Sequence, residues 1–271
     1  MDTTKFVNRH VGITAEDLPD MLKTVGVNTL DELIDQTIPA NIRLKQPLNL
    51  PEPMTEREFA EHINELASKN EVFTSYIGMG WYDTVCPAPI QRNVFENPVW
   101  YTSYTPYQAE VSQGRLEALL NFQTVICDLT GLPLANCSLL DEATAAAEAA
   151  TMFFGARSRA QVKAGANVLF VDEKVFASTL AVIHTRTIPQ GMKIVTGDYK
   201  TFSFTPEVFG AIVQYPNADG SIEDYREFIG RAQENGTKVA VAADLMSLVL
   251  LTPPGEWDAD VVFGSSQRFG I

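Results

Sequence analysis

The sequence predicts an α/β fold with a mostly parallel sheet, preceded by a helical and loop-rich N-terminal arm. From about residue 167, short apolar segments alternate with helical patterns, as in parallel strands joined by helices. The earlier chain instead contains short capped helices, Pro-rich links and a long aromatic stretch. We therefore divide the chain into an arm with an aromatic loop region, 1–108, and an incomplete large domain, 109–271.

Three short helices are predicted in the arm, each opened by a threonine cap. The caps are Thr14, Thr29 and Thr55. Asp17 and Glu32, three positions after the first two caps, complete the pattern in which cap and acid bond each other's backbone. Residues 76–108 are rich in aromatics, Pro and Gly, so they predict a long loop that lines a site or an interface.

The large domain contains the alternating elements. The predicted helices are 109–130, 141–157, 175–186 and 221–236, and the predicted strands are 167–172, 193–198, 211–217, 238–244 and 260–266. Gly131 closes the first helix, the alanine-rich TAAAEAA favours the second, and Ser221 is the expected cap of the last. The chain stops soon after a buried-looking strand, which predicts an incomplete sheet domain.

Composition excludes several classes of function. The net charge of −14 disfavours nucleic acid and anionic membrane surfaces as partners, because both repel an acidic field. The first residues show no signal-peptide or transit-peptide pattern, and no apolar run is long enough to span a membrane, so we expect a cytoplasmic protein. The three cysteines form no CxxC pair, so neither a disulfide framework nor a metal site is predicted.

The start of the helix at 141–157 is one candidate ligand site. Ala143 and Thr144 leave the first backbone N–H groups accessible, and these groups together with the helix dipole could cradle a phosphate. The alternative is an ordinary N-capped helix, which Asp141 and Glu142 favour because they would repel a dianion.

Asp244 is a second candidate because it ends an apolar strand, where parallel sheets bind ligands. In pyridoxal-phosphate (PLP) enzymes of the aminotransferase fold, such an aspartate keeps the pyridine nitrogen protonated. The alternative is that Asp244 caps the helix that follows. No lysine follows Asp244, and Arg268 cannot replace one because arginine stays protonated.

The aromatic stretch contains a third group of candidates, which are either core anchors or walls of a site. The group is Trp81, Tyr82, Trp100, Tyr101, Tyr104 and Tyr107. Its polar neighbours Thr102, Thr105 and Gln108 favour a site or a subunit interface.

Several segments match one known family. They are RHVG (9–12), IPANIRLKQPLNLP (38–51), YIGMGWYDT (76–84), ENPVWYTSYTPYQAEVSQGRLEALLNFQT (96–124), DLTGLPLAN (128–136), SLLDEATAAAEA (138–149), TPPGEWDADVV (252–262) and GSSQRFG (264–270). On these segments the chain resembles the N-terminal half of the glycine cleavage system P-protein, glycine dehydrogenase (decarboxylating). The resemblance covers nearly the whole chain, although the family's N-terminal half continues well past Ile271.

The resemblance implies part of a PLP-dependent transferase of the aminotransferase-like fold type I. The family decarboxylates glycine and passes the aminomethyl group to the lipoyl arm of the H-protein. The Schiff-base lysine belongs to the C-terminal half, which is a second region of one chain or a partner subunit. Alignment on the ADV tripeptide (259–261) puts Arg268 where that lysine would stand, so this chain alone is expected to be inactive.

The resemblance also assigns expected roles to single residues. Residues expected at the shared site or interface are Tyr101, Thr102, Tyr104, Tyr107 and Gln108. Vestigial counterparts of cofactor contacts are Ala143, Thr144 and Asp244. The alternative is a non-catalytic supporting or interaction subunit that binds a partner chain and no cofactor.

Overall fold

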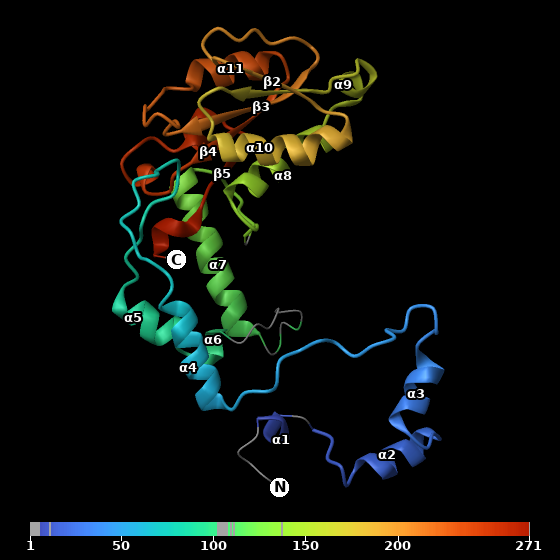
Figure 1. Ribbon diagram of the computed structural model, residues 1–271. Coiled ribbons are helices and arrows are strands. Elements are labelled where there is room, and N and C mark those ends of the chain that lie inside the picture. The colour runs from blue at the N-terminus through green and yellow to red at the C-terminus, as the bar shows by residue number, and fades with distance from the viewer. Residues whose placement is uncertain are drawn as a thin grey trace. The chain divides into compact units, whose positions relative to one another are not determined.

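The computed structural model describes residues 6–10, 12–101, 108, 110, 112–136 and 138–270 (Figure 1). The chain forms two compact units, Met1–Thr74 and Ser75–Ile271. Throughout the described ranges, no helix combines the length and apolar character needed to cross a membrane.

The first unit is held together by local helix caps. Its helices are α1 (Val7–His10), α2 (Leu18–Val25), α3 (Leu30–Thr37) and α4 (Glu56–Ala67). Thr29 caps α3 by accepting the Glu32 N–H, and Thr55 forms a full capping box with Glu58 at the start of α4. Among the described residues of this unit only Val27 is buried. A helical N-terminal region is therefore confirmed, and its described residues form no apolar core.

The Thr14 and Asp17 pair bonds as predicted but stands just before its helix. Each side chain accepts a hydrogen bond from the other residue's backbone N–H, at 3.2 Å in both directions. The pair closes a turn, and α2 begins only at Leu18. Gly26, in the left-handed conformation with φ 89°, ends this helix as predicted.

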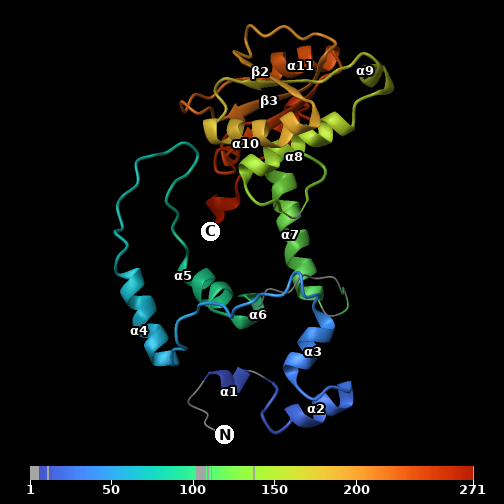
Figure 2. The same cartoon turned by 45° about the vertical axis from the view of Figure 1, so that its right-hand side comes forward.

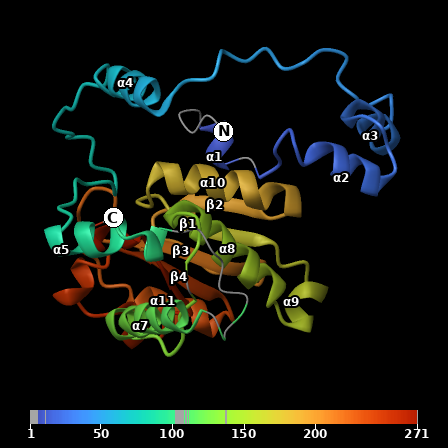
Figure 3. The same cartoon turned by 90° about the horizontal axis from the view of Figure 1, so that it is seen from below.

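The second unit is built on a five-stranded parallel sheet, seen along a different axis in Figure 3. Its strands are β1 (Val168–Asp172), β2 (Lys193–Gly197), β3 (Val208–Tyr215), β4 (Lys238–Ala243) and β5 (Val261–Phe263). They run in the order β2-β1-β3-β4-β5, and each adjacent pair is parallel. The predicted α/β class and its parallel sheet are confirmed.

Helices cover both faces of the sheet. On one face α8 (Glu142–Gly155) and α10 (Ala177–Thr187) lie side by side (Figure 2) and pack on Leu169 and Val171 of β1. On the other face α11 (Arg226–Glu234) packs on Val168 and Phe170, joined by the end of α7 (Gln113–Thr130). Since strand side chains alternate between faces, burial of all five β1 residues requires this double cover.

Several short elements lie within or between the predicted ones. They are α5 (Ala88–Ile90), the π-helical η1 (Gln91–Phe95), α6 (Pro98–Tyr101), α9 (Arg159–Lys163), η2 (Ile188–Gln190), η3 (Ser247–Val249), η4 (Pro254–Trp257) and η5 (Ser266–Phe269). Three of them interrupt the predicted loop at 76–108, so that stretch contains local helical turns.

Two predicted boundaries were wrong for identifiable reasons. Ser221 does not cap α11, because its N–H and hydroxyl both donate to Asp219 Oδ1, at 2.9 and 2.6 Å. The helix begins instead at Arg226, whose N–H donates to Asp224 Oδ1. The strand predicted at 211–217 spans Val208–Tyr215, and Pro216, which has no N–H to donate, follows its end.

Two glycine substitutions are expected to change stability in opposite directions. An added Cβ at Gly264 would lie 2.2 Å from the Ala243 carbonyl oxygen, whereas one at Gly230 in α11 meets nothing within 4 Å. We expect Gly264→Ala to lower the free energy of unfolding by about 2–3 kcal/mol. Gly230→Ala should raise it by about 0.5–1 kcal/mol, because alanine favours the helix and restricts the unfolded chain. Urea denaturation measures both, and equal stability of the two variants would contradict the close approach of β4 and β5.

Candidate functional site

A cleft of about 190 Å³ lies at the carboxyl ends of the strands in the second unit. Phe176, which follows β1, and Gln214 near the end of β3 line it together with Asp244 after β4 and Arg268 after β5. The chain leaves β1 toward β2 on one side of the sheet, and it leaves β3 toward β4 on the other side. This divergence leaves a crevice at the carboxyl ends of β1 and β3, where α/β proteins bind ligands.

The dominant contact in the cleft is an ion pair between Arg268 and Asp244. The Arg268 Nε donates to both carboxylate oxygens, at 2.9 and 3.1 Å, and Nη2 donates to Oδ2 as well. The guanidinium carbon also lies 4.7 Å from the centre of the Tyr82 ring. The hydrogen bond to Asp244 raises the pKa of Arg268 further above its ordinary value, so this arginine remains a cation.

Asp244 lies where the sequence predicted it, directly after β4. Its Oδ1 accepts the backbone N–H of Met246 at 3.0 Å, which closes a turn just before η3 and does not cap that helical turn. The same carboxylate is engaged by Arg268, so both of its oxygens already have donors.

The start of α8 is capped by its own acidic residue. Asp141 Oδ1 accepts the Thr144 N–H at 2.6 Å, and this bond lowers the pKa of Asp141. The Glu142 carboxyl lines the cleft, where burial raises its pKa to about 7 against an opposing hydrogen bond from Gln214. Ala143 and Thr144 are not among the described residues that line the cleft.

Gln267 hydrogen-bonds the loop that contains Gly80 and Tyr82 and holds it at the cleft. Its Nε2 donates to the Gly80 carbonyl at 2.7 Å, and its Oε1 accepts the Tyr82 N–H at 3.3 Å. Gly80 has φ 89°, and a Cβ there would lie 2.6 Å from the Phe176 ring, so only glycine fits. This anchoring brings Tyr82 and Gly80 from the aromatic loop region to the cleft.

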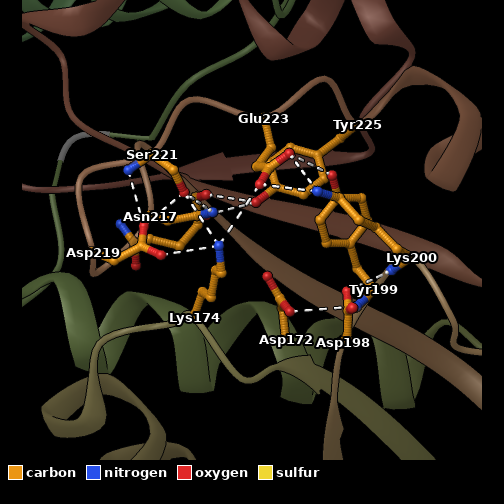
Figure 4. A network of polar contacts seen from close by, with 11 residues as sticks. Asp172, Lys174, Asp198, Tyr199, Lys200, Asn217, Asp219, Ser221, Glu223 and Tyr225 are labelled. Atoms are coloured by element: carbon orange, nitrogen blue, oxygen red, sulfur yellow. Dashed lines mark hydrogen bonds and ion pairs between the residues drawn. The ribbon is translucent and has the colours of Figure 1, made fainter.

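A polar network supports the wall of the cleft next to β3 (Figure 4). Lys174 Nζ lies 2.9 Å from Asp219 Oδ2 and donates to Ser221 Oγ, which also accepts from Asn217 Nδ2. The Tyr225 hydroxyl donates to Asn217 Oδ1 at 2.7 Å. These contacts tie together the loops that follow β1 and β3, and so fix the position of Asn217 in the cleft wall.

Asp172, at the end of β1, is a buried carboxyl with incomplete hydrogen bonding. It is 1% exposed, Oδ1 accepts the Tyr199 N–H at 3.4 Å, and Oδ2 has no hydrogen-bond partner among the described residues. Burial raises its pKa to about 6, and the nearby Asp198 and Glu173 carboxylates add to the effect.

The predicted aromatic site residues are only partly described. Tyr101, the last residue of α6, is 61% exposed, and Gln108 is also exposed. Thr102, Tyr104 and Tyr107 lie outside the described residues. Neither Tyr101 nor Gln108 is among the described residues that line the cleft.

The sequence analysis missed three functional candidates in the cleft, namely Glu142 as a buried acid, Gln214 and Gln267. A signal existed for Gln214, since it is a polar residue near the end of an otherwise apolar buried strand. No local pattern identifies Gln267, because its partners lie 185 and 187 residues away. In the described ranges no group of His, Cys, Asp or Glu could hold a metal ion.

The cleft does not fit PLP as its residues stand. A PLP site of this fold needs a carboxylate for the ring nitrogen, an amine and donors for the phosphate. Here Arg268 engages the Asp244 carboxylate, and no lysine is among the described residues of the lining. Asp141 takes the Thr144 N–H at the start of α8, where Glu142 adds a second acidic group.

Comparison with known proteins identifies the family. The family model described as "Glycine cleavage system P-protein" matches residues 8–271. The chain is 67% identical over 270 residues to glycine dehydrogenase (decarboxylating) of Bacteroides fragilis, covering 100% of this chain and 28% of that protein. It is 55% identical over 271 residues to the Flavobacterium johnsoniae protein of the same name, covering 100% of this chain and 29% of that protein. The chain thus spans less than a third of these relatives.

Solved structures agree with the sequence matches. The crystal structure of glycine decarboxylase (P-protein) of the glycine cleavage system, in inhibitor-bound form, is 32% identical with a TM-score of 0.83, covering 95% of this chain and 58% of that chain. Oryza sativa TDC with PLP and tryptamine has a TM-score of 0.54 at 12% identity, covering 95% of this chain and 64% of that chain, which shows a shared fold alone.

The ion pair in the cleft should contribute measurably to stability. Arg268 and Asp244 have side chains only 22% and 28% exposed, whereas Arg226 and Asp224 form a similar pair at 70% and 56%. We expect Arg268→Met to lower the free energy of unfolding by about 1–2 kcal/mol, because it leaves a half-buried carboxylate unpaired. Arg226→Met should change it by less than about 0.5 kcal/mol. Equal effects of the two variants in chemical denaturation would show that the cleft pair is no stronger than a surface pair.

Asp172 should make stability depend on pH. Its pKa rises from an ordinary value of 3.8 to about 6 on folding, so the protonated form is favoured in the folded state. The resulting stability is fully present below about pH 4 and is lost as the pH rises through 6, a change of up to about 3 kcal/mol. The Asp172→Asn variant should therefore lack this contribution to the slope of unfolding free energy against pH.

The control for this prediction is Asp128→Asn, which alters an exposed carboxylate on α7. Denaturation curves measured between about pH 4 and pH 8 should keep the wild-type slope in this control variant. A wild-type slope in Asp172→Asn would mean that Asp172 does not titrate in this range.

Proposed function

Because this chain belongs to the glycine cleavage system P-protein family, we propose that it forms the N-terminal, cofactor-free half of a glycine dehydrogenase (decarboxylating). The whole enzyme, on this proposal, decarboxylates glycine with PLP and transfers the aminomethyl group to the lipoyl H-protein. The PLP and its lysine belong to a C-terminal half or partner subunit. This chain supports that half and supplies residues to its site.

One observation carries the proposal, namely the ion pair between Arg268 and Asp244. A carboxylate that pairs with the pyridine nitrogen must be free to do so, and Asp244 instead accepts three hydrogen bonds from a guanidinium. Arginine keeps its proton and therefore cannot form an imine. The pair thus neutralises the acidic group internally, and the family resemblance assigns position 268 to the expected lysine.

Two exposed residues at the end of the aromatic loop region support a role beside a partner. Tyr101 and Gln108 are both exposed, and tyrosine side chains are common where an apolar body meets a polar partner surface. We propose that Tyr101, Thr102, Tyr104, Tyr107 and Gln108 reach the shared site. Ala143, Thr144 and Asp244 are then vestigial counterparts of cofactor contacts.

A second candidate is a purely supporting subunit that contributes no residue to the shared site. The internally paired cleft favours this candidate equally, since both interpretations leave the cleft without PLP. The two differ in the whole enzyme, where Tyr101→Phe and Gln108→Ala would lower glycine–bicarbonate exchange only if these side chains reach the reacting groups.

The chain should fail to form a specific PLP adduct. After incubation with PLP and reduction by borohydride, peptide mass spectrometry should find only scattered, substoichiometric labelling of lysines, because no amine is positioned beside Asp244 among the described residues of the lining. R268K should gain label at position 268 above the background of R226K, which places an amine on an exposed site. A stoichiometric adduct on one lysine of the wild-type chain would overturn the proposal.

A further inference from the structure

Gln214, which lines the cleft, carries a buried acceptor that has no donor among the described residues. Gln214 is 2% exposed, and its Oε1 has no hydrogen-bond partner among the described residues. The same side chain bonds to the Glu142 carboxyl, which lies beside it in the cleft. An unpaired buried acceptor is costly, so this arrangement favours a ligand that brings N–H or O–H donors.

The charges around that acceptor favour a cation. Asp141, Glu142 and Asp244 place three carboxyl groups near the start of α8, and Arg268 is the one cation among the described residues of the cleft lining. Two nitrogens of Arg268 are engaged by Asp244. The remaining electrostatic potential in the cleft is therefore negative, so it repels anions and attracts a small cation.

The apolar walls of the cleft favour a ligand that has a hydrocarbon part. Phe176, Pro216 and Ala218 line it, and its volume is about 190 Å³. A water molecule occupies about 30 Å³ of the liquid, so the cleft has room for more than one solvent molecule. A ligand with a short hydrocarbon part would contact these walls while its polar end reaches Gln214.

We propose that the cleft binds a small organic molecule that carries a primary ammonium group on a short apolar chain. Its N–H groups donate to Gln214 Oε1 and to the Glu142 carboxylate, and its hydrocarbon part lies against Phe176 and Pro216. Charge-assisted hydrogen bonds of this kind are stronger than those between neutral groups, so the ammonium end determines specificity. The proposal needs no PLP and does not depend on the partner half.

Calorimetric titration of the chain with propylammonium chloride tests the proposal. The titration is done at about pH 8, where the Glu142 carboxyl is ionised. We expect saturable binding of one molecule per chain with Kd on the order of 1–10 mM, as suits so small a ligand. Tetramethylammonium chloride at equal ionic strength has the same charge but no N–H group, and it should not compete.

Matched variants locate the site. Glu142→Gln and Gln214→Met should each raise Kd about 10-fold or more, because each removes one acceptor. Glu148→Gln on the same helix and Gln190→Met on the surface should bind as the wild type does, and circular dichroism confirms that all four variants are folded.

Three outcomes would overturn the proposal. They are no saturable binding up to about 100 mM, equal affinity of the wild type and both cleft variants, or competition by tetramethylammonium. The first outcome would mean that ordered water, and not a ligand, donates to Gln214 Oε1. None of these results bears on labelling by PLP, so failure here is distinguishable from failure of the proposed function.

Discussion

The parallel sheet of the second unit is buried on both faces, and this constraint governs where chemistry is possible. Apolar residues alternate along β1 between the α8 side and the α11 side, so neither face offers room for polar groups. Polar side chains are left to the strand ends. Asp172, Gln214 and Asp244 all lie at or beside the carboxyl end of a strand, and the cleft forms there.

The cleft lies where α/β proteins bind ligands, and several of its polar groups bond one another. Asp244 pairs with Arg268, and Gln267 fastens the loop that carries Gly80 and Tyr82. Each contact uses a residue just beyond β5, so the last turn, η5 (Ser266–Phe269), joins the sheet edge to the aromatic loop region. The geometry is thus maintained by internal contacts.

The sequence predicted those features that depend on local pattern. The helices with threonine caps and the alternation of apolar strands with helices were recovered, because capping and periodicity act over a few residues. The position of Asp244 followed from the end of its strand. The start of α11 was missed, because Ser221 bonds Asp219 and Asn217 instead of the helix.

Contacts between distant parts of the chain could not be predicted in this way. The bonds from Gln267 to Gly80 and Tyr82 join residues separated by most of the chain, and the unpaired acceptor of Gln214 is visible only once its surroundings are assembled. The pairing of Arg268 with Asp244 also limits which residues position 268 tolerates. A lysine there would present an amine beside Asp244, but it would lose the forked guanidinium contacts to both carboxylate oxygens. The gain of an amine would thus weaken a half-buried ion pair before any cofactor could compensate.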